Sequence, residues 1–153
     1  MAECLLGEGD RAYEVLRAAM PAAYNTRAEI RQSEPYVQAQ TTYSRYSPRE
    51  GNARTAWLTG AAAWFYFSAA QYVLGLRPER DGLRIDPCLP AAWDGFSARR
   101  VFRGKTLEIR VHNPGRIQRG VSKLLLNGEA LQGNLVPFEK MKETNQVQVW
   151  LGE

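Results

Sequence analysis

The sequence is poor in the side chains that most often perform catalysis or bind metals. It contains one histidine, His112, and two cysteines, Cys4 and Cys88, among 153 residues. A catalytic triad built on histidine would therefore depend on a single residue. The two cysteines have neither the spacing of a metal site nor that of a redox motif, so we expect no metal and no resident cofactor. Sparse, unpaired cysteines fit a reducing compartment, and we expect a cytoplasmic protein.

Charge and apolar runs limit the classes of partner. Lysine and arginine outnumber aspartate and glutamate by 20 to 16, but the basic residues are scattered. Neither a basic run nor an RNA-type aromatic motif is present, so we expect no nucleic-acid partner. The longest apolar stretch, residues 58–74, is at the lower limit for a membrane helix, and Ser68 and Gln71 interrupt it. We expect a core helix and no membrane partner, and acidic residues near the N-terminus interrupt any signal-peptide pattern.

The sequence pattern changes near residue 78, which predicts two structural parts. Before it, helical spacing and caps, Asp10 among them, predict helices at residues 1–6, 10–20 and 60–74, with turns at 22–33. After it, alternation predicts strands at residues 82–86, 97–102, 106–111, 121–126 and 147–151. Arg103-Gly104-Lys105 and Asn127-Gly128 are typical hairpin and type I′ turn sequences. We expect an α+β protein, with a helical part at residues 1–78 and an antiparallel β-sandwich-like part at residues 79–153.

Thr59 and Gly60 mark the start of the most apolar predicted helix. From Phe65 to Leu74 this helix is apolar on nearly every face, which is typical of a helix buried inside something larger. Thr59 is a good N-cap, and Gly60 lets another group approach the backbone closely. The free N–H groups of the first turn and the helix dipole favour an anion there. An ordinary capped core helix is the alternative, and from the local residues alone it is the more common case.

Other polar and aromatic residues have ordinary structural explanations beside a functional one. Tyr43, Tyr46 and Arg49 precede the predicted helix in a loop, where they fit a sugar pocket or a plain surface. Trp57 and Trp64 are seven residues apart, and packing in the core is the favoured role for both. A solvated sheet face is the favoured place for the arginines of the predicted strands, which are Arg99, Arg100, Arg103 and Arg110.

An ordered series of short stretches resembles a known enzyme family. The stretches are residues 34–37 (EPYV), 57–64 (WLTGAAAW), 71–78 (QYVLGLRP), 81–90 (DGLRIDPCLP), 93–96 (WDGF) and 102–106 (FRGKT). In this order they resemble the C-terminal end of the cellobiose and chitobiose phosphorylases, glycoside hydrolase family 94. The resemblance covers roughly residues 8–135, and the stretch from Glu139 onward fits less well.

The resemblance implies both a fold and an activity. Enzymes of this family are inverting glycoside phosphorylases, a kind of hexosyltransferase, with an (α/α)₆ barrel followed by a β-sheet domain. Phosphate attacks the anomeric carbon of a β-linked disaccharide, such as cellobiose or N,N'-diacetylchitobiose, and an aspartic acid protonates the leaving oxygen. The products include a sugar 1-phosphate. By this resemblance, residues 1–78 are the last barrel helices and residues 79–153 are the C-terminal domain.

The resemblance also assigns roles to individual residues. It places Thr59 and Gly60 at the phosphate, a co-substrate rather than a cofactor, and Gln40 at the sugar. At Ala62 the chain departs from the family, where a threonine usually stands. The acid aspartate of the family lies upstream, as do an arginine and a histidine that hold phosphate, and His112 is on a predicted strand of the other part. The chain thus resembles a C-terminal fragment without a catalytic residue, which we expect to be inactive alone.

The implied partners are the disaccharide, phosphate, the missing upstream barrel and a second copy in a homodimer of the full-length enzyme. Three aspartates near predicted turns, Asp81, Asp86 and Asp94, are interpreted as structural rather than catalytic.

A second hypothesis assigns the protein to another functional class. As a separate chain, the protein is then a non-catalytic module that binds carbohydrate or contacts another subunit.

Overall fold

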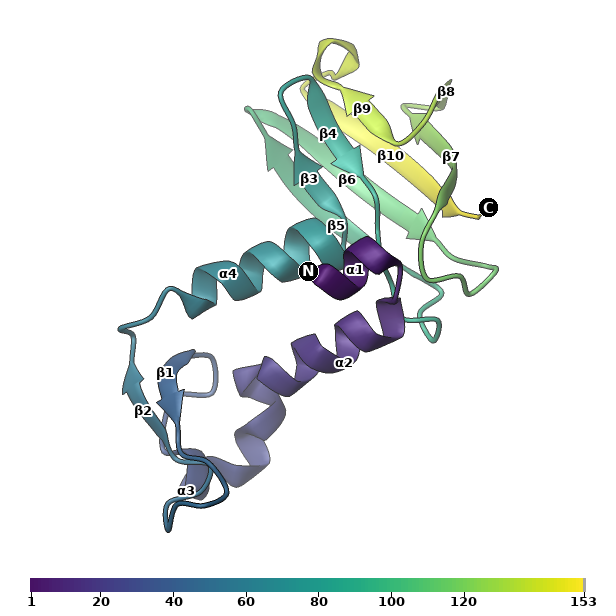
Figure 1. Ribbon diagram of the computed structural model, residues 1–153. Coiled ribbons are helices and arrows are strands. Elements are labelled where there is room, and N and C mark those ends of the chain that lie inside the picture. Colours follow the sequence, from purple (N-terminus) through teal and green to yellow (C-terminus); the bar gives the residue numbers. More distant parts are fainter. Residues whose placement is uncertain (153) are drawn as a thin grey trace. The chain divides into compact units, whose positions relative to one another are not determined.

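The computed structural model describes residues 1–152, and of Asn25 the backbone alone. The chain divides into two compact units by its contacts. We call residues 14–67 the hairpin unit, and residues 1–13 together with those from Ser68 onward the β unit. The architecture is a mixture of helices and sheets, as predicted (Figure 1). The predicted boundary between residues 78 and 79 separates a barrel part from a C-terminal domain, which is a different division from these compact units, and it stays a prediction.

The β unit contains two sheets. The five-stranded sheet has the order β5-β6-β10-β7-β8, and the three-stranded sheet has the order β3-β4-β9 (Figure 1). The first is formed by β5 (Gly95–Phe102), β6 (Lys105–His112), β7 (Val121–Leu126), β8 (Glu129–Leu131) and β10 (Thr144–Leu151). The second is formed by β3 (Leu76–Pro78), β4 (Gly82–Ile85) and β9 (Leu135–Pro137), and the short 3₁₀ helix η3 (Phe138–Lys140) follows β9.

The inner faces of the two sheets share one apolar core. In β6, alternate residues point inward, and Leu107, Ile109 and Val111 are all buried. Leu83 and Ile85 of β4 belong to the same buried cluster. Alternation along a strand places every second side chain on one face, so these strands bury one face of each sheet against the other. The sandwich-like arrangement expected from the sequence is therefore present.

One strand pair corrects the prediction that this part is antiparallel. β10 pairs with β7 in antiparallel fashion but with β6 in parallel, with Val147 opposite Ile109 and Val149 opposite Val111. β6 and β7 run in opposite directions, and the last strand is inserted between them. A strand in that position must be parallel to one of its neighbours. Alternation within a single strand does not indicate its neighbours, so the sequence pattern could not predict this pairing.

The predicted turns between strands are confirmed. Arg103 and Gly104 join β5 to β6 with φ angles of 49° and 83°. Asn127 and Gly128 join β7 to β8 with φ angles of 52° and 90°. Two successive positive φ values are the mark of a type I′ turn, whose twist matches that of the strands.

The predicted central helix consists of α4 (Ala61–Phe67), continued by the π-helix η2 (Ser68–Val73). It ends at Gly75, which has a φ of 67°, and a Cβ there would lie 2.2 Å from the Asp86 carbonyl carbon. The predicted helix and its glycine stop are thus confirmed. Its predicted burial holds only in the second half: Ala70 and Val73 of η2 are buried, whereas α4 has no buried residue, and Trp64 and Tyr66 are both 62% exposed.

The N-terminal helices depart from prediction in two details. α1 (Ala2–Leu6) and α2 (Gly9–Ala19) are present, and α2 ends before Pro21 as expected. Asp10 is not the N-cap of α2 as predicted, because it is the second residue of the helix; its carboxylate accepts a hydrogen bond of 2.8 Å from the Ala91 N–H. The predicted turns at 22–33 are instead largely helical, with η1 (Pro21–Arg27) and α3 (Ala28–Arg31). None of the helices within residues 1–152 has the length and apolarity to cross a membrane.

The hairpin unit contains a small sheet that the sequence did not reveal. β1 (Ala39–Thr42) and β2 (Ala53–Ala56) pair in antiparallel fashion. The buried Asn52 amide donates to the Ile30 carbonyl and to Gln32 Oε1, at 3.3 and 2.8 Å, and so joins the hairpin to α3. Both strands are short and largely exposed, so neither shows the alternation by which strands are recognised.

Candidate functional site

The hairpin unit holds all three residues to which the resemblance assigns a ligand. Gln40 is the second residue of β1, and Thr59 and Gly60 follow β2 just before α4. In the hairpin register, Ala39 is opposite Ala56 and Thr41 is opposite Arg54. Gln40 therefore lies across from the end of β2, a few residues before the start of α4. Strand pairing brings the candidate sugar and phosphate residues into the same part of the unit.

Thr59 caps α4, as predicted. Its Oγ1 accepts a hydrogen bond of 3.1 Å from the Ala61 N–H. The Gly60 carbonyl then accepts from the Trp64 N–H at 3.2 Å, which begins the helical hydrogen bonding. A hydroxyl that accepts one bond still has its own proton to donate. The N-cap geometry therefore leaves the Thr59 O–H available to a ligand that accepts hydrogen bonds.

Gly60 is exposed, and nothing in the described chain requires a glycine there. Its φ is not positive, and a Cβ built on it would meet no atom within 4 Å. Neither backbone conformation nor packing against residues 1–152 therefore accounts for the missing side chain. A small residue at the start of a helix gives an incoming group access to the backbone N–H groups.

Trp57, which leads into this cap, contacts two residues of the 34–37 stretch. Its indole N–H donates to Glu34 Oε1 at 3.1 Å, and its ring meets Tyr36 edge to face, with centroids 6.1 Å apart. The indole hydrogen bond, with a smaller contribution from the Glu34 backbone, lowers the pKa of this carboxyl below its usual value. The predicted core role of Trp57 is wrong for this chain, because the side chain is 67% exposed. Instead, Trp57 links two stretches that carry the resemblance.

The backbone around Trp57 is strained. Thr55 and Trp57 have φ angles of 56° and 70°, in the left-handed region that favours glycine. A β-branched threonine is rare there, and each such residue costs on the order of 1–3 kcal/mol. Strain of this kind is found at turns and functional sites. Here it shapes the segment that leads from β2 to the Thr59 cap.

The loop between β1 and β2 is exposed, as the plain-surface interpretation of Tyr43 and Tyr46 predicts. The Arg45 guanidinium lies 4.9 Å from the centre of the Tyr46 ring and donates to its hydroxyl at 2.7 Å. Arg49 lines a polar cavity of about 520 Å³ with Glu29, Asn52 and Arg54. A second cavity of about 680 Å³ is lined by Tyr24, Arg27, Arg31, Gln38 and neighbouring residues. Gln40, Thr59 and Gly60 line neither of these two cavities.

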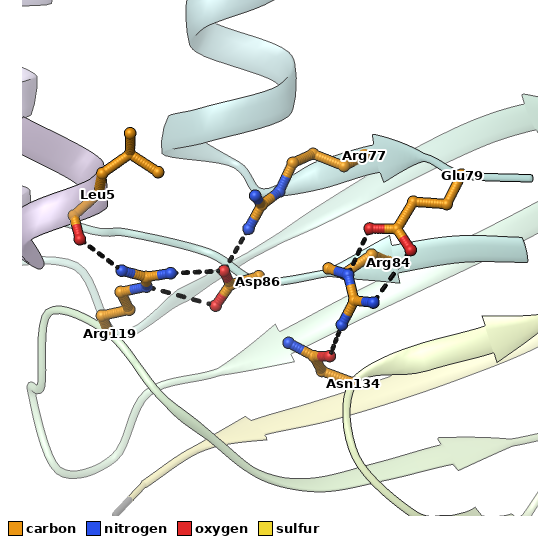
Figure 2. Close-up of polar contacts among 7 residues, drawn as sticks. All are labelled: Leu5, Arg77, Glu79, Arg84, Asp86, Arg119 and Asn134. Atoms are coloured by element: carbon orange, nitrogen blue, oxygen red, sulfur yellow. Dashed lines mark hydrogen bonds and ion pairs between the residues drawn. The ribbon is translucent and has the colours of Figure 1, made fainter. Parts of the chain in front are cut away.

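Asp86 and His112 of the β unit both contact neighbouring side chains. Asp86 is paired with Arg77 and with Arg119, the latter at 2.9 Å (Figure 2). This agrees with the structural role expected for Asp86. His112 lies in β6, as expected, and stacks on Trp150 with ring centroids 4.8 Å apart. Within residues 1–152, no three His, Cys, Asp or Glu side chains are arranged to hold a metal ion.

Comparison with known protein families identifies two matching segments. Residues 1–75 match the family described as "Glycosyl hydrolase 94 superfamily, catalytic domain". The chain belongs to the glycosyl hydrolase 94 superfamily. Residues 76–118 match a second family, described as "Glycosyl hydrolase family 65, C-terminal domain". The resemblance noted in the sequence is therefore confirmed.

Several relatives are phosphorylases by name. The chain is 40% identical to the N,N'-diacetylchitobiose phosphorylases of Vibrio furnissii and Vibrio proteolyticus over 99% of its length. It is 32% identical to the solabiose phosphorylase of Paenibacillus borealis over 97% of its length. In each case the chain spans 19% of the relative's length.

Proposed function

We propose that the chain supplies the phosphate and sugar contacts of an inverting glycoside phosphorylase that cleaves a β-linked disaccharide. It does so as the C-terminal part of that enzyme, with α2–α4 as the last helices of an (α/α)₆ barrel. The observation that carries the proposal is the capped and open start of α4, where Thr59 holds the Ala61 N–H and Gly60 has no neighbour within 4 Å of a Cβ. The proposal is also supported by the similarity of nearly the whole chain to the end of a relative that is named a phosphorylase.

Phosphate is the ligand that this helix start suits. Inside a helix, the first four N–H groups have no carbonyl partner, and an anion satisfies them. In α4 the Ala61 N–H is already bonded to Thr59, which leaves the neighbouring N–H groups and the Thr59 hydroxyl for phosphate oxygens. Where the family usually has a threonine, this chain has Ala62. Thr59 therefore supplies the side-chain hydroxyl at the start of α4.

Gln40 is the proposed sugar contact. It is exposed on β1, and no hydrogen bond of its side chain is found among the described residues. A carboxamide both donates and accepts, which suits the neighbouring hydroxyls of a pyranose ring. Because β1 and β2 pair, Gln40 is held on the same hairpin that positions Thr59.

The general acid is not among the residues of the hairpin unit. The unit contains no aspartate, and the glutamate next to the site, Glu34, is hydrogen-bonded to Trp57. That bond lowers the Glu34 pKa, which keeps the carboxyl ionised. A general acid must be protonated at the working pH, which requires a raised pKa. We therefore assign the acid to the upstream barrel, and we propose that the chain alone does not catalyse phosphorolysis.

The exposed apolar side chains point to the partner that completes the site. Around the start of α4, Trp57, Leu58, Trp64 and Tyr66 are between 62% and 72% exposed. Large apolar surfaces of this kind mark contacts with other protein. We propose that the rest of the catalytic barrel covers them, in a cytoplasmic enzyme that forms homodimers. The same surface also favours the second candidate function, a non-catalytic module that contacts another subunit.

A chimera tests the proposal. In the Vibrio furnissii phosphorylase, this chain replaces the segment that it matches, and release of sugar 1-phosphate from N,N'-diacetylchitobiose is measured. We expect phosphate-dependent turnover by the chimera and none by the chain alone. A folded chimera that binds the sugar but releases no sugar 1-phosphate would contradict the catalytic proposal and favour the non-catalytic module.

A further inference from the structure

The two cysteines of the chain, 84 positions apart, meet inside the β unit. Cys4 is on α1, and Cys88 lies between β4 and β5. Both are buried, with 4% and 1% of their surface exposed, and both are free thiols. Their side chains interact, and each shifts the pKa of the other. This contact has no part in the proposed phosphorolysis, because the sugar and phosphate residues lie in the hairpin unit.

Arg119 holds the two cysteine segments together. Its guanidinium donates to the Leu5 carbonyl, next to Cys4, at 2.9 Å, and also pairs with Asp86 (Figure 2). The backbone of Arg119 forms an antiparallel bridge with Cys88. Arg119 therefore contacts both segments, the one that carries Cys4 and the one that carries Cys88. The Cys88 N–H, which donates to the Val73 carbonyl at 2.9 Å, fixes the second cysteine further.

The surroundings make the two thiols chemically unequal. The interaction with Cys88 is the main cause that lowers the Cys4 pKa below its usual value; Arg119 also lowers it, while burial and Glu3 oppose the shift. The same interaction and burial raise the Cys88 pKa, with Asp86 adding to the rise and Arg119 opposing it. Near neutral pH the pair is therefore one thiolate and one thiol. A thiolate beside a second cysteine is the arrangement in which oxidation ends in a disulfide.

We propose that Cys4 and Cys88 form a reversible disulfide when the protein meets hydrogen peroxide. The Cys4 thiolate attacks one peroxide oxygen, the O–O bond breaks, and Cys4 sulfenic acid and hydroxide form. Cys88 then loses its proton and attacks the Cys4 sulfur, which expels hydroxide and closes the S–S bond. Overall, two thiols and one peroxide give one disulfide and two waters, with two electrons passing from sulfur to oxygen. A dithiol reductant reverses the bond by exchange.

The bond would fasten α1 to the β unit independently of the Arg119 contacts. At present α1 is linked to this region by the hydrogen bond from Arg119 to the Leu5 carbonyl and by the thiol pair. A disulfide across positions 4 and 88 would close a long loop of chain. Long loops lose the most entropy in the unfolded state, so the oxidised protein is expected to melt about 5–15 °C higher than the reduced protein.

The test treats the reduced full chain with a small excess of hydrogen peroxide, then alkylates it and measures its intact mass. We expect the loss of two hydrogen atoms, protection of both cysteines from alkylation, a monomer on a non-reducing gel, and full reversal by dithiothreitol. In Cys88→Ser, the Cys4 sulfenic acid should be trapped by dimedone. Alkylation of both cysteines after peroxide, a bond between two chains, or overoxidised Cys4 beside a free Cys88 would overturn the proposal.

A wild-type control in urea keeps the test independent of how the variants fold. When the chain is unfolded, the cysteines lose their mutual positioning, and disulfide formation should slow by at least about tenfold. An equal rate in urea would show that the fold does not promote the bond, and this too would overturn the proposal.

Discussion

Exposed apolar side chains around α4 should make the isolated chain self-associate. We expect the double substitution Trp64→Lys and Tyr66→Lys to suppress this association. Both aromatic side chains are 62% exposed, and α4 has no buried residue. Lysine is a good helix former, so the change removes apolar surface without breaking the helix.

The magnitude follows from the exposed surface. Full burial of one large apolar side chain is worth about 1.5–3 kcal/mol. Trp57, Leu58, Trp64 and Tyr66 are each roughly two-thirds exposed, so together they retain on the order of 4–8 kcal/mol per chain. Two copies offer twice this amount, and association costs at least about 4 kcal/mol. The surplus is at most about 4–12 kcal/mol, which corresponds to dissociation constants from roughly millimolar down to nanomolar.

Light scattering coupled to size exclusion, over a range of protein concentrations, measures this association. The matched control is Val101→Lys, because Val101 is also apolar and 64% exposed but lies on β5. The average mass of wild type and of the control should rise with concentration, and that of the double variant should stay near the monomer. A wild-type chain that is monomeric at every concentration would refute the reasoning, as would a control that suppresses association equally.

Three further predictions concern stability, pH and activity. Asp86→Asn should lower the free energy of unfolding in urea by about 1.5–3 kcal/mol, since Asp86 bonds to two arginines, whereas the exposed Asp94→Asn should change it by less than about 0.5 kcal/mol. Equal effects would contradict this. Because its bond to Trp57 lowers the Glu34 pKa, the contact should persist through the usual range near about 4.3 and be lost only below it. An acid-induced change in tryptophan fluorescence with a midpoint below that value, absent in Glu34→Gln, checks this, and a midpoint above it would count against it. The purified chain alone should release no sugar 1-phosphate from cellobiose or N,N'-diacetylchitobiose, as general acid catalysis is worth ~10²–10⁴-fold; measurable release would disprove this.

The local features of the β unit could be predicted from the sequence because neighbouring residues determine them. Alternation identifies strands such as β6, and Arg103-Gly104 and Asn127-Gly128 identify the turns. The pairing of β10 with both β6 and β7 could not be predicted, since it joins residues far apart in the sequence. The short, exposed strands β1 and β2 lack the alternation that would have revealed them.

Local features around the candidate site could be predicted from the sequence, whereas contacts between distant residues could not. The Thr59 cap depends on a hydroxyl two residues before an N–H, which a sequence displays directly. The contact between Glu34 and Trp57 spans 23 positions and passes through backbone with positive φ, which no local pattern indicates. Burial of Trp64 was expected from its apolar neighbours, but burial depends on tertiary packing, and Trp64 is 62% exposed.

The central claim is that Thr59 contacts phosphate, and the phosphate dependence of the chimera tests it most directly. Thr59→Val keeps the shape and removes the hydroxyl. Losing a hydrogen bond to a charged group costs about 1.5–3 kcal/mol, so kcat/KM for phosphate should fall roughly tenfold to hundredfold. Thr59→Ser keeps the hydroxyl and should remain close to wild type, while Gln40→Ala should weaken use of the disaccharide instead. A Thr59→Val chimera that folds with an unchanged melting temperature and keeps the wild-type phosphate response would contradict the account.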